Sequence, residues 1–217
     1  MKNILLIAGI FTLLTGNSFA SNWSIPTQSI QQQYKTTNKY PKYTLGIDIG
    51  QSWINFDKDE DYSYKEIAAD KYNTININFG SRFTPKIGLE AFLQKSSNES
   101  KKTAYHPDSI ETNIEYLALG GDLLLYQPIN KDIEILAALG LAYYDFDITG
   151  KASHFDQYYE DNDSAESLGM RTGLGLQFNI NSNWAVRIMG RYTTLLNHKQ
   201  DYIKNISELS LGIRYLF

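Results

Sequence analysis

Ten charged residues recur at alternate positions along the chain and are the first candidates for chemistry. Five are carboxylates and five are arginines, so their charges balance. A planar guanidinium pairs bidentately with a carboxylate, which favours arginine over lysine wherever ions must pair. The sequence therefore predicts an ion-pair network formed by Asp48, Arg82, Glu90, Asp122, Glu134, Arg171, Arg187, Arg191, Glu208 and Arg214.

Hydrolysis is a second chemistry that the residue types allow. It needs a nucleophile with a base in reach and an acid that orients the base. The histidines, His106, His154 and His198, all fall in expected loops, and none forms a His-X-Ser pattern on a strand. Ser153, His154 and Asp156 lie close in sequence, but neighbours on one loop seldom hold a preorganised geometry. We therefore expect no catalytic residue.

Acidic runs are the candidates for metal binding. The run DKDED, which starts at Asp57, begins like a calcium loop. Its sixth position is Tyr62 instead of glycine and its twelfth is Ala68 instead of glutamate, so the geometry of an EF-hand fails. The run DNDSAE fails similarly. We expect no metal site and no cofactor, and we interpret both runs as solvated loops, with casual cation binding as the alternative.

The elements that position these residues are strands, because apolar and polar residues alternate with a period of two. Eight segments of about 9–13 residues show this pattern, which is the length that a tilted membrane strand requires. They are residues 43–53, 73–83, 86–94, 115–126, 133–144, 168–180, 184–192 and 208–217.

Short and long connections alternate between these segments. The short ones lie at Thr84-Pro85 and at residues 127–132 and 181–183, whereas the long ones cover residues 55–72, 96–112, 149–167 and 195–205. Turns on one side and loops on the other predict an all-β, eight-stranded, antiparallel up-and-down transmembrane β-barrel.

Aromatic residues favour a barrel with its apolar face outward. Tyr43 and Trp53 are ten residues apart, or about 25 Å along the membrane normal for a strand tilted by about 40°. That is the spacing of the two aromatic girdles of a membrane barrel. We assign the girdle to Tyr43, Trp53, Trp184, Tyr192 and Tyr215. A soluble, lipocalin-like barrel, apolar inside, is the alternative.

With this orientation the ten charged residues lie in the lumen. Unpaired buried ions are expensive, so the charges must pair. An eight-stranded lumen is just wide enough for its own side chains, and glycines on the polar face make room for them. We favour a structural plug, and a small conduit is the alternative.

The longest expected loops are acidic and carry aromatic residues. Tyrosine gives a large contact area at a low cost in entropy. We therefore expect loop contacts with a host or envelope protein through Tyr62, Tyr64, Phe155, Tyr158 and Tyr159. The net acidity of the loops favours basic partners; loops that only cap the barrel are the alternative.

The N-terminus carries an export signal. Lys2, an apolar run over residues 4–14 and small residues before position 21 predict a cleaved signal peptide over residues 1–20. Residues 21–42 are polar and read as a periplasmic leader, and residues 43–217 form the barrel domain. The chain of 217 residues has a net charge of −4 and no cysteine, so neither nucleic-acid binding nor thiolate chemistry is expected.

The sequence resembles the OmpA-type family of small outer-membrane β-barrels, which includes the opacity, Ail-like and porin-family proteins. The resemblance covers about residues 43–217 and rests on the eight strands, the signal peptide and the C-terminal pattern that ends in Phe217. It implies that the last strand is recognised by the barrel-assembly machinery, with Phe217 as the assembly signal. The chain lacks a C-terminal peptidoglycan-binding domain, so wall tethering by that route is not expected.

These observations predict a non-enzymatic protein of the bacterial outer membrane that displays acidic surface loops, for envelope integrity or for surface or host contact. Its partners are outer-membrane lipid, the barrel-assembly machinery and a host or envelope protein. A narrow porin for small solutes is the alternative. A membrane-embedded hydrolase that modifies lipid A is the second alternative.

Overall fold

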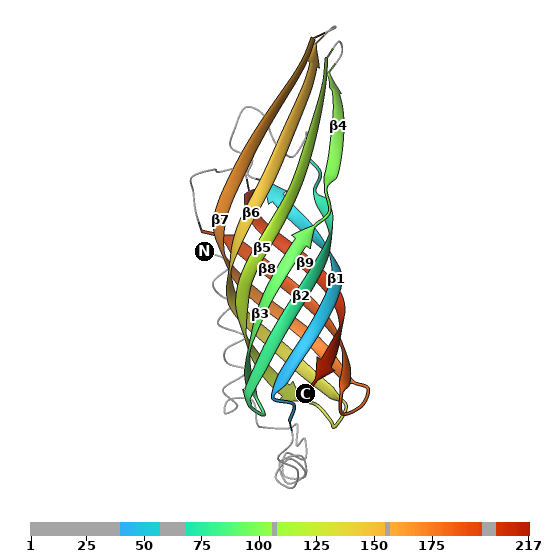
Figure 1. The fold of residues 1–217 in the computed structure, drawn as a ribbon, viewed down its shortest axis with the longest axis vertical. Coiled ribbons are helices and arrows are strands. Elements are labelled where there is room, and N and C mark those ends of the chain that lie inside the picture. Colours follow the sequence, from blue (N-terminus) through green and yellow to red (C-terminus); the bar gives the residue numbers. More distant parts are fainter. Residues whose placement is uncertain (1–39, 57–67, 106–107, 155–156, 197–202) are drawn as a thin grey trace, which may run out of the picture. The chain divides into compact units, whose positions relative to one another are not determined.

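The computed structural model describes residues 40–56, 68–105, 108–154, 157–196 and 203–217. Antiparallel strands make up almost all of these residues (Figure 1). Among them, no helix is long and apolar enough to cross a membrane. The strands are β1 Tyr43–Phe56, β2 Lys71–Thr84, β3 Ile87–Ser96, β4 Glu99–Tyr105, β5 Asp108–Pro128, β6 Ile133–His154, β7 Gln157–Asn179, β8 Trp184–Leu195 and β9 Ile203–Leu216.

Eight of these strands close into a ring. Each strand pairs antiparallel with the next, β3 pairs directly with β5, and β9 returns to pair with β1. β4 lies outside the ring. It pairs with the first part of β5, and β3 pairs with the later part of the same strand. The predicted eight-stranded, up-and-down β-barrel is confirmed.

Three short turns at one end of the barrel, here called the lower end, each start at a side chain that caps the backbone. Thr84 Oγ1 accepts hydrogen bonds from the N–H groups of residues 86 and 87 at 3.2 and 3.0 Å. Asn130 Oδ1 accepts from residues 132 and 133 at 2.8 and 2.9 Å, and Asn181 Oδ1 does the same for residues 183 and 184. Such side chains favour tight turns.

The seam between the first and last strands also closes at the lower end. The N–H of Lys42 donates to the carbonyl of Phe217 at 3.1 Å, and the N–H of Phe217 donates to the carbonyl of Tyr43 at 3.0 Å. Tyr40 donates its hydroxyl to the carbonyl of Phe83 at 2.9 Å. The predicted signal peptide and most of the predicted leader lie outside the described residues.

At the upper end, β4, β5, β6 and β7 continue beyond the other strands (Figure 1). β6 and β7 stay in one register from Ile133↔Phe178 to His154↔Gln157. We call β4 together with residues 108–115, 145–154 and 157–166 the extended sheet.

The extended sheet corrects two expectations. Residues 96–112 and 149–167 were expected to be loops, but most of them form strands. Tyr158 and Tyr159 therefore lie in β7, and His154 ends β6. The physical reason is that both faces of this part of the sheet carry polar residues, so the apolar alternation stops although the backbone pairing continues.

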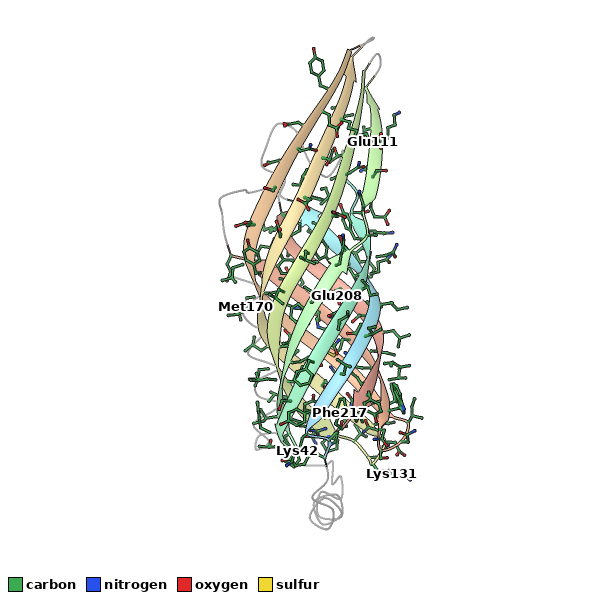
Figure 2. The ribbon with its side chains drawn as sticks, viewed as in Figure 1. Lys42, Glu111, Lys131, Met170, Glu208 and Phe217 are labelled. Carbon is green, nitrogen blue, oxygen red and sulfur yellow. The ribbon has the colours of Figure 1, made fainter. Side chains whose placement is uncertain are left out.

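The two faces of the barrel differ as the alternation predicts. Large apolar residues such as Leu45, Ile77 and Leu119 are about half exposed on the outer face. The inner face buries charged residues in the lower part and apolar and aromatic residues near the upper end. Figure 2 shows the labelled Met170 on the outer face.

Candidate functional site

The structure buries all ten residues of the expected ion-pair network, and none is more than 7% exposed. They come from all eight strands of the ring, each from the inward-facing phase of its strand. We call these ten residues the lumen network.

Three ion pairs in the lumen network are short. Arg214 binds Asp48 bidentately, with N–O distances of 2.6 and 3.0 Å. Arg187 Nη1 lies 2.7 Å from Glu90 Oε2, and Arg82 Nη2 lies 2.8 Å from Glu134 Oε1. Charge-assisted pairs of this geometry are the strongest hydrogen bonds that side chains form.

Longer contacts join these pairs to the remaining members. Arg191 lies between three carboxylates, at 3.5 Å from Asp122, 3.5 Å from Glu208 and 3.8 Å from Glu90. Arg171 lies 3.8 Å from Asp122. Every arginine of the lumen network therefore faces at least one carboxylate.

Amide side chains complete the connections. Gln177 Oε1 accepts hydrogen bonds from Arg187 at 3.0 and 3.2 Å, and Gln177 Nε2 donates to Glu134 at 3.2 Å. Gln94 donates to Glu208 at 3.0 Å. Through Gln177 the Arg82–Glu134 pair belongs to the same network as Glu90.

Glycines in the lumen provide the space that the carboxylates occupy. A Cβ added at Gly212 would overlap the carboxylate of Asp48, and one added at Gly140 would overlap that of Asp122. Any larger residue at these positions would displace an ion pair.

Arg171 has an unusual environment. Its guanidinium carbon lies 3.7 Å from the centre of the Phe92 ring, and none of its three nitrogens has a hydrogen-bond partner among the described residues. Both carboxylate oxygens of Asp122 also lack a hydrogen bond within the described part of the chain. A cation stacked on an aromatic face is stabilised electrostatically without a hydrogen bond.

An aromatic layer lies above the lumen network. We use this name for Tyr72, Tyr116, Tyr144 and Phe146, which are all at most 2% exposed. Tyr116 contacts the other three, with ring centroids 5.6 to 6.5 Å apart. Its hydroxyl donates to Ser52 at 2.9 Å and accepts from Gln94 at 3.2 Å.

The aromatic layer was not predicted from the sequence. The signal was present, because Tyr116 and Tyr144 have the same inward phase as Asp122 and Glu134 on their strands. Phe92, which stacks on Arg171, likewise has the inward phase of Glu90. Following that phase past the last charged residue would have found all of them.

The expected girdle residues lie on the outer face. At the lower end, Trp184 packs edge-on against Tyr215 at 5.0 Å, Tyr215 against Phe217 at 4.8 Å, and Tyr43 stacks on Phe79 at 6.1 Å. Figure 2 shows Phe217 at this end, near Lys42. Trp53 and Tyr192 lie toward the upper ends of β1 and β8.

The extended sheet gathers the acidic residues. It carries ten acidic residues and three lysines, and Figure 2 shows the labelled Glu111 on it. Lys151 lies 4.0 Å from Glu160, and both are partly exposed. Tyr159 is 59% exposed. The expected contact residues Tyr62, Tyr64 and Phe155 lie outside the described residues, as do His106 and His198.

The described residues contain no group of three or more His, Cys, Asp or Glu side chains that could hold a metal ion.

Comparison with known proteins identifies the class of barrel. The model of one family, the outer membrane protein beta-barrel domain, matches residues 24–217. No curated protein matches the sequence.

Several solved structures share the fold. The chain is similar to Ail, the attachment invasion locus protein of Yersinia pestis, at 18% identity and a TM-score of 0.54, over 82% of this chain and 100% of that chain. It is also similar to Neisserial surface protein A, at 13% identity and a TM-score of 0.55, over 81% and 97% of the two chains. A major outer membrane protein from Thermus thermophilus matches at 10% identity and a TM-score of 0.54, over 81% and 99%.

Identities this low show a common fold, whereas the family match covers most of the chain and agrees with the apolar outer face. The chain therefore belongs to the outer membrane protein beta-barrel domain family and is a β-barrel protein of the bacterial outer membrane.

Proposed function

We propose that the protein is a non-enzymatic surface protein whose extended sheet contacts basic partner proteins outside the membrane. The observation that carries this proposal is the continuation of β6 and β7, without a change of register, about ten residues past the apolar outer face. Strands that only closed the barrel would end near the girdle, as β8 does at Leu195.

The charge of the extended sheet indicates the kind of partner. Its ten acidic residues and three lysines give a strongly negative surface. Such a surface attracts positively charged proteins and repels polyanions. One structure of Ail is a complex with the heparin analogue sucrose octasulfate. The charge of this chain's extended sheet favours the opposite class of partner.

The lumen supports a structural role rather than conduction. The balanced charges of the lumen network pair across the bore, and the aromatic layer lies above them.

A binding experiment with a shortened sheet tests the proposed function. The variant replaces residues 147–164 by Asn-Gly, which joins the paired residues Phe146 and Ala165 through a two-residue turn. The intact protein and this variant are placed in lipid nanodiscs. Binding to immobilised lysozyme, a basic protein, and to heparin is then measured at physiological salt.

The intact protein is expected to bind lysozyme and not heparin, and the shortened variant to lose at least tenfold in affinity for lysozyme. Heat-modifiable gel mobility serves as the control that the shortened barrel still folds. Equal binding by the two proteins, or a preference for heparin, would contradict the proposal.

A further inference from the structure

The lower end of the barrel is basic. Lys42 precedes β1, Lys86 lies in the turn between β2 and β3, and Lys131 lies in the turn between β5 and β6. We call these three residues the lower lysines. All of them are exposed, and Figure 2 shows Lys42 and Lys131 at this end. Within the described turns of the lower end, Asp132 is the one exposed acidic side chain.

Backbone hydrogen bonds fix the places of the lower lysines on the rim. The carbonyl of Lys42 accepts from the N–H of Arg82 on β2, and the carbonyl of Lys86 accepts from the N–H of Tyr126 on β5, both at 2.8 Å. Because β3 pairs with β5 in the ring, Lys131 lies in the next turn around the rim. The spacing of strands places neighbouring lower lysines about 7–10 Å apart.

Each lower lysine adjoins an exposed apolar or aromatic side chain. These neighbours are Tyr43, Ile87 and Ile129, which are 49%, 40% and 49% exposed. Tyr43 and Ile87 begin β1 and β3 and belong to the apolar outer face. A lysine at such a boundary can lay its aliphatic stem along apolar surface and place its ammonium at the level of lipid headgroups.

The acidic residue at this end does not satisfy the lower lysines. Asp132 lies 4.0 Å from Lys131, and their side chains are 61% and 79% exposed. An ion pair as exposed as this contributes little free energy. Lys131 can therefore bind another anion at little cost.

We propose that the lower end binds anionic phospholipids through the lower lysines. The short turns of an outer-membrane barrel face the periplasm, so the lipids are those of the periplasmic leaflet. A lysine near a membrane surface favours an anionic headgroup by about fivefold in association. Lipid is favoured over a soluble acidic protein because the lower lysines are continuous with the apolar face that lipid covers. This surface is separate from the extended sheet and adds a second role to the proposed function.

The opposite end of the membrane band has the opposite charge. Glu115, Asp145 and Glu166 follow Leu117, Tyr143 and Leu168 on the outer face of β5, β6 and β7, by the alternation of side chains. Carboxylates at this level repel anionic headgroups. The preference for anionic lipid is therefore expected at the lower end only, which provides a comparison within one molecule.

Two matched fluorescent reporters test the proposal. In a full-length chain whose tryptophans, Trp23, Trp53 and Trp184, are replaced by Phe, one variant carries Tyr43→Trp at the lower end and the other carries Tyr143→Trp at the upper end. The two tyrosines lie on the outer face and are 49% and 44% exposed. Each folded variant is placed in phosphatidylcholine vesicles. Quenching by brominated phosphatidylglycerol is compared with quenching by brominated phosphatidylcholine, which gives the relative association of the two lipids with each end.

The lower reporter is expected to show about fivefold stronger association with phosphatidylglycerol than with phosphatidylcholine, and the upper reporter no preference for phosphatidylglycerol. Replacing the lower lysines together by Gln is expected to reduce the preference below twofold, whereas replacing them by Arg is expected to keep it. The control exchanges three lysines of the other end, Lys71, Lys95 and Lys102, for Gln and is expected to leave the preference unchanged. A salt concentration of about 1 M is expected to weaken it.

Equal association of the two lipids with the lower reporter would overturn the inference. An equal preference at the two reporters would overturn it as well, and this comparison requires no lysine variant to fold. A preference that survives replacement of the lower lysines by Gln, in a protein with the heat-modifiable mobility of a folded barrel, would also contradict it. The lysozyme experiment concerns the other end of the molecule, so either proposal can fail without the other.

Discussion

Glu90 faces more arginines than any other carboxylate of the lumen network, so we expect its charge to matter most for stability. It is 1% exposed and faces Arg187 at 2.7 Å and Arg191 and Arg214 at 3.8 Å each. At an effective dielectric constant of about 20, each of these arginines attracts the carboxylate by roughly 4–6 kcal/mol before desolvation is counted. The free-energy cost of desolvating the ions offsets much of this attraction. When only the carboxylate is removed, the arginines stay buried and their desolvation cost remains.

Glu90→Gln keeps the volume of the side chain and removes its charge, which leaves three buried arginines undercompensated. Removing one partner of a buried ion pair costs about 3–5 kcal/mol. For a urea dependence of about 2 kcal/mol per M, the midpoint of unfolding is expected to fall by about 2 M. The assay is urea unfolding in lipid vesicles, read by tryptophan fluorescence and by heat-modifiable gel mobility.

Two controls make this prediction specific. Glu115→Gln removes a carboxylate whose side chain is 30% exposed and lies 3.8 Å from Lys95, so it is expected to change the free energy of unfolding by less than about 1 kcal/mol. Glu90→Gln combined with Arg187→Met removes both charges of the shortest Glu90 pair and is expected to recover at least about 1 kcal/mol. If Glu90→Gln costs no more than Glu115→Gln, or if the double variant shows additive losses, the reasoning about the lumen network is refuted.

Three further results are expected. Gly212→Ala should push the Asp48 carboxylate away from Arg214 and lower the free energy of unfolding by about 1–3 kcal/mol. The control Gly190→Ala should change the free energy of unfolding little, because its added Cβ would have no neighbour closer than 3.9 Å. Equal effects of the two substitutions on urea unfolding would contradict the packing argument. Phe217→Ala should reduce the amount of folded barrel in the outer membrane severalfold and impair refolding in detergent much less. The control Phe83→Ala removes a lower-end aromatic residue of similar exposure, 55% against 60%, and should affect the cellular level and the refolding equally. Normal cellular levels of the Phe217→Ala protein would contradict the role of Phe217 as the assembly signal. Pure refolded protein in a planar bilayer should show no discrete current steps, because the charges of the lumen are paired and the aromatic layer lies above them. Regular current steps would instead support the alternative function, a narrow porin.

The sequence predicted the ring because lipid imposes a simple rule on it. Most outward residues between the girdles are apolar, so a period of two marks strands such as residues 168–180, and the inward phase locates residues such as Arg171 and Glu134. The ten residues of the lumen network could be predicted without knowing which strands pair. The partner of each arginine did require this knowledge, because Arg82 and Glu134, for example, lie on strands that are not neighbours in the ring.

The extended sheet escaped prediction for the converse reason. Residues 159–164 are exposed on both faces of the sheet, and a strand in water has no need of an apolar face. The DNDS stretch from Asp161 to Ser164 therefore looks like a loop, although each residue pairs with β6. Its order comes from the unbroken ladder of backbone hydrogen bonds that begins in the membrane, a non-local effect that local composition does not reveal.

The Arg214–Asp48 pair spans the seam between β1 and β9, two strands separated by 166 positions along the chain. A contact of such high sequence separation forms late in folding. Until the last strand is in place, Asp48 lacks its bidentate arginine partner, and the wall of the barrel keeps an open margin. Docking of β9 closes this margin and brings Arg214 to Asp48 in a single event, so a wall without its last strand has both an open edge and a carboxylate without its partner.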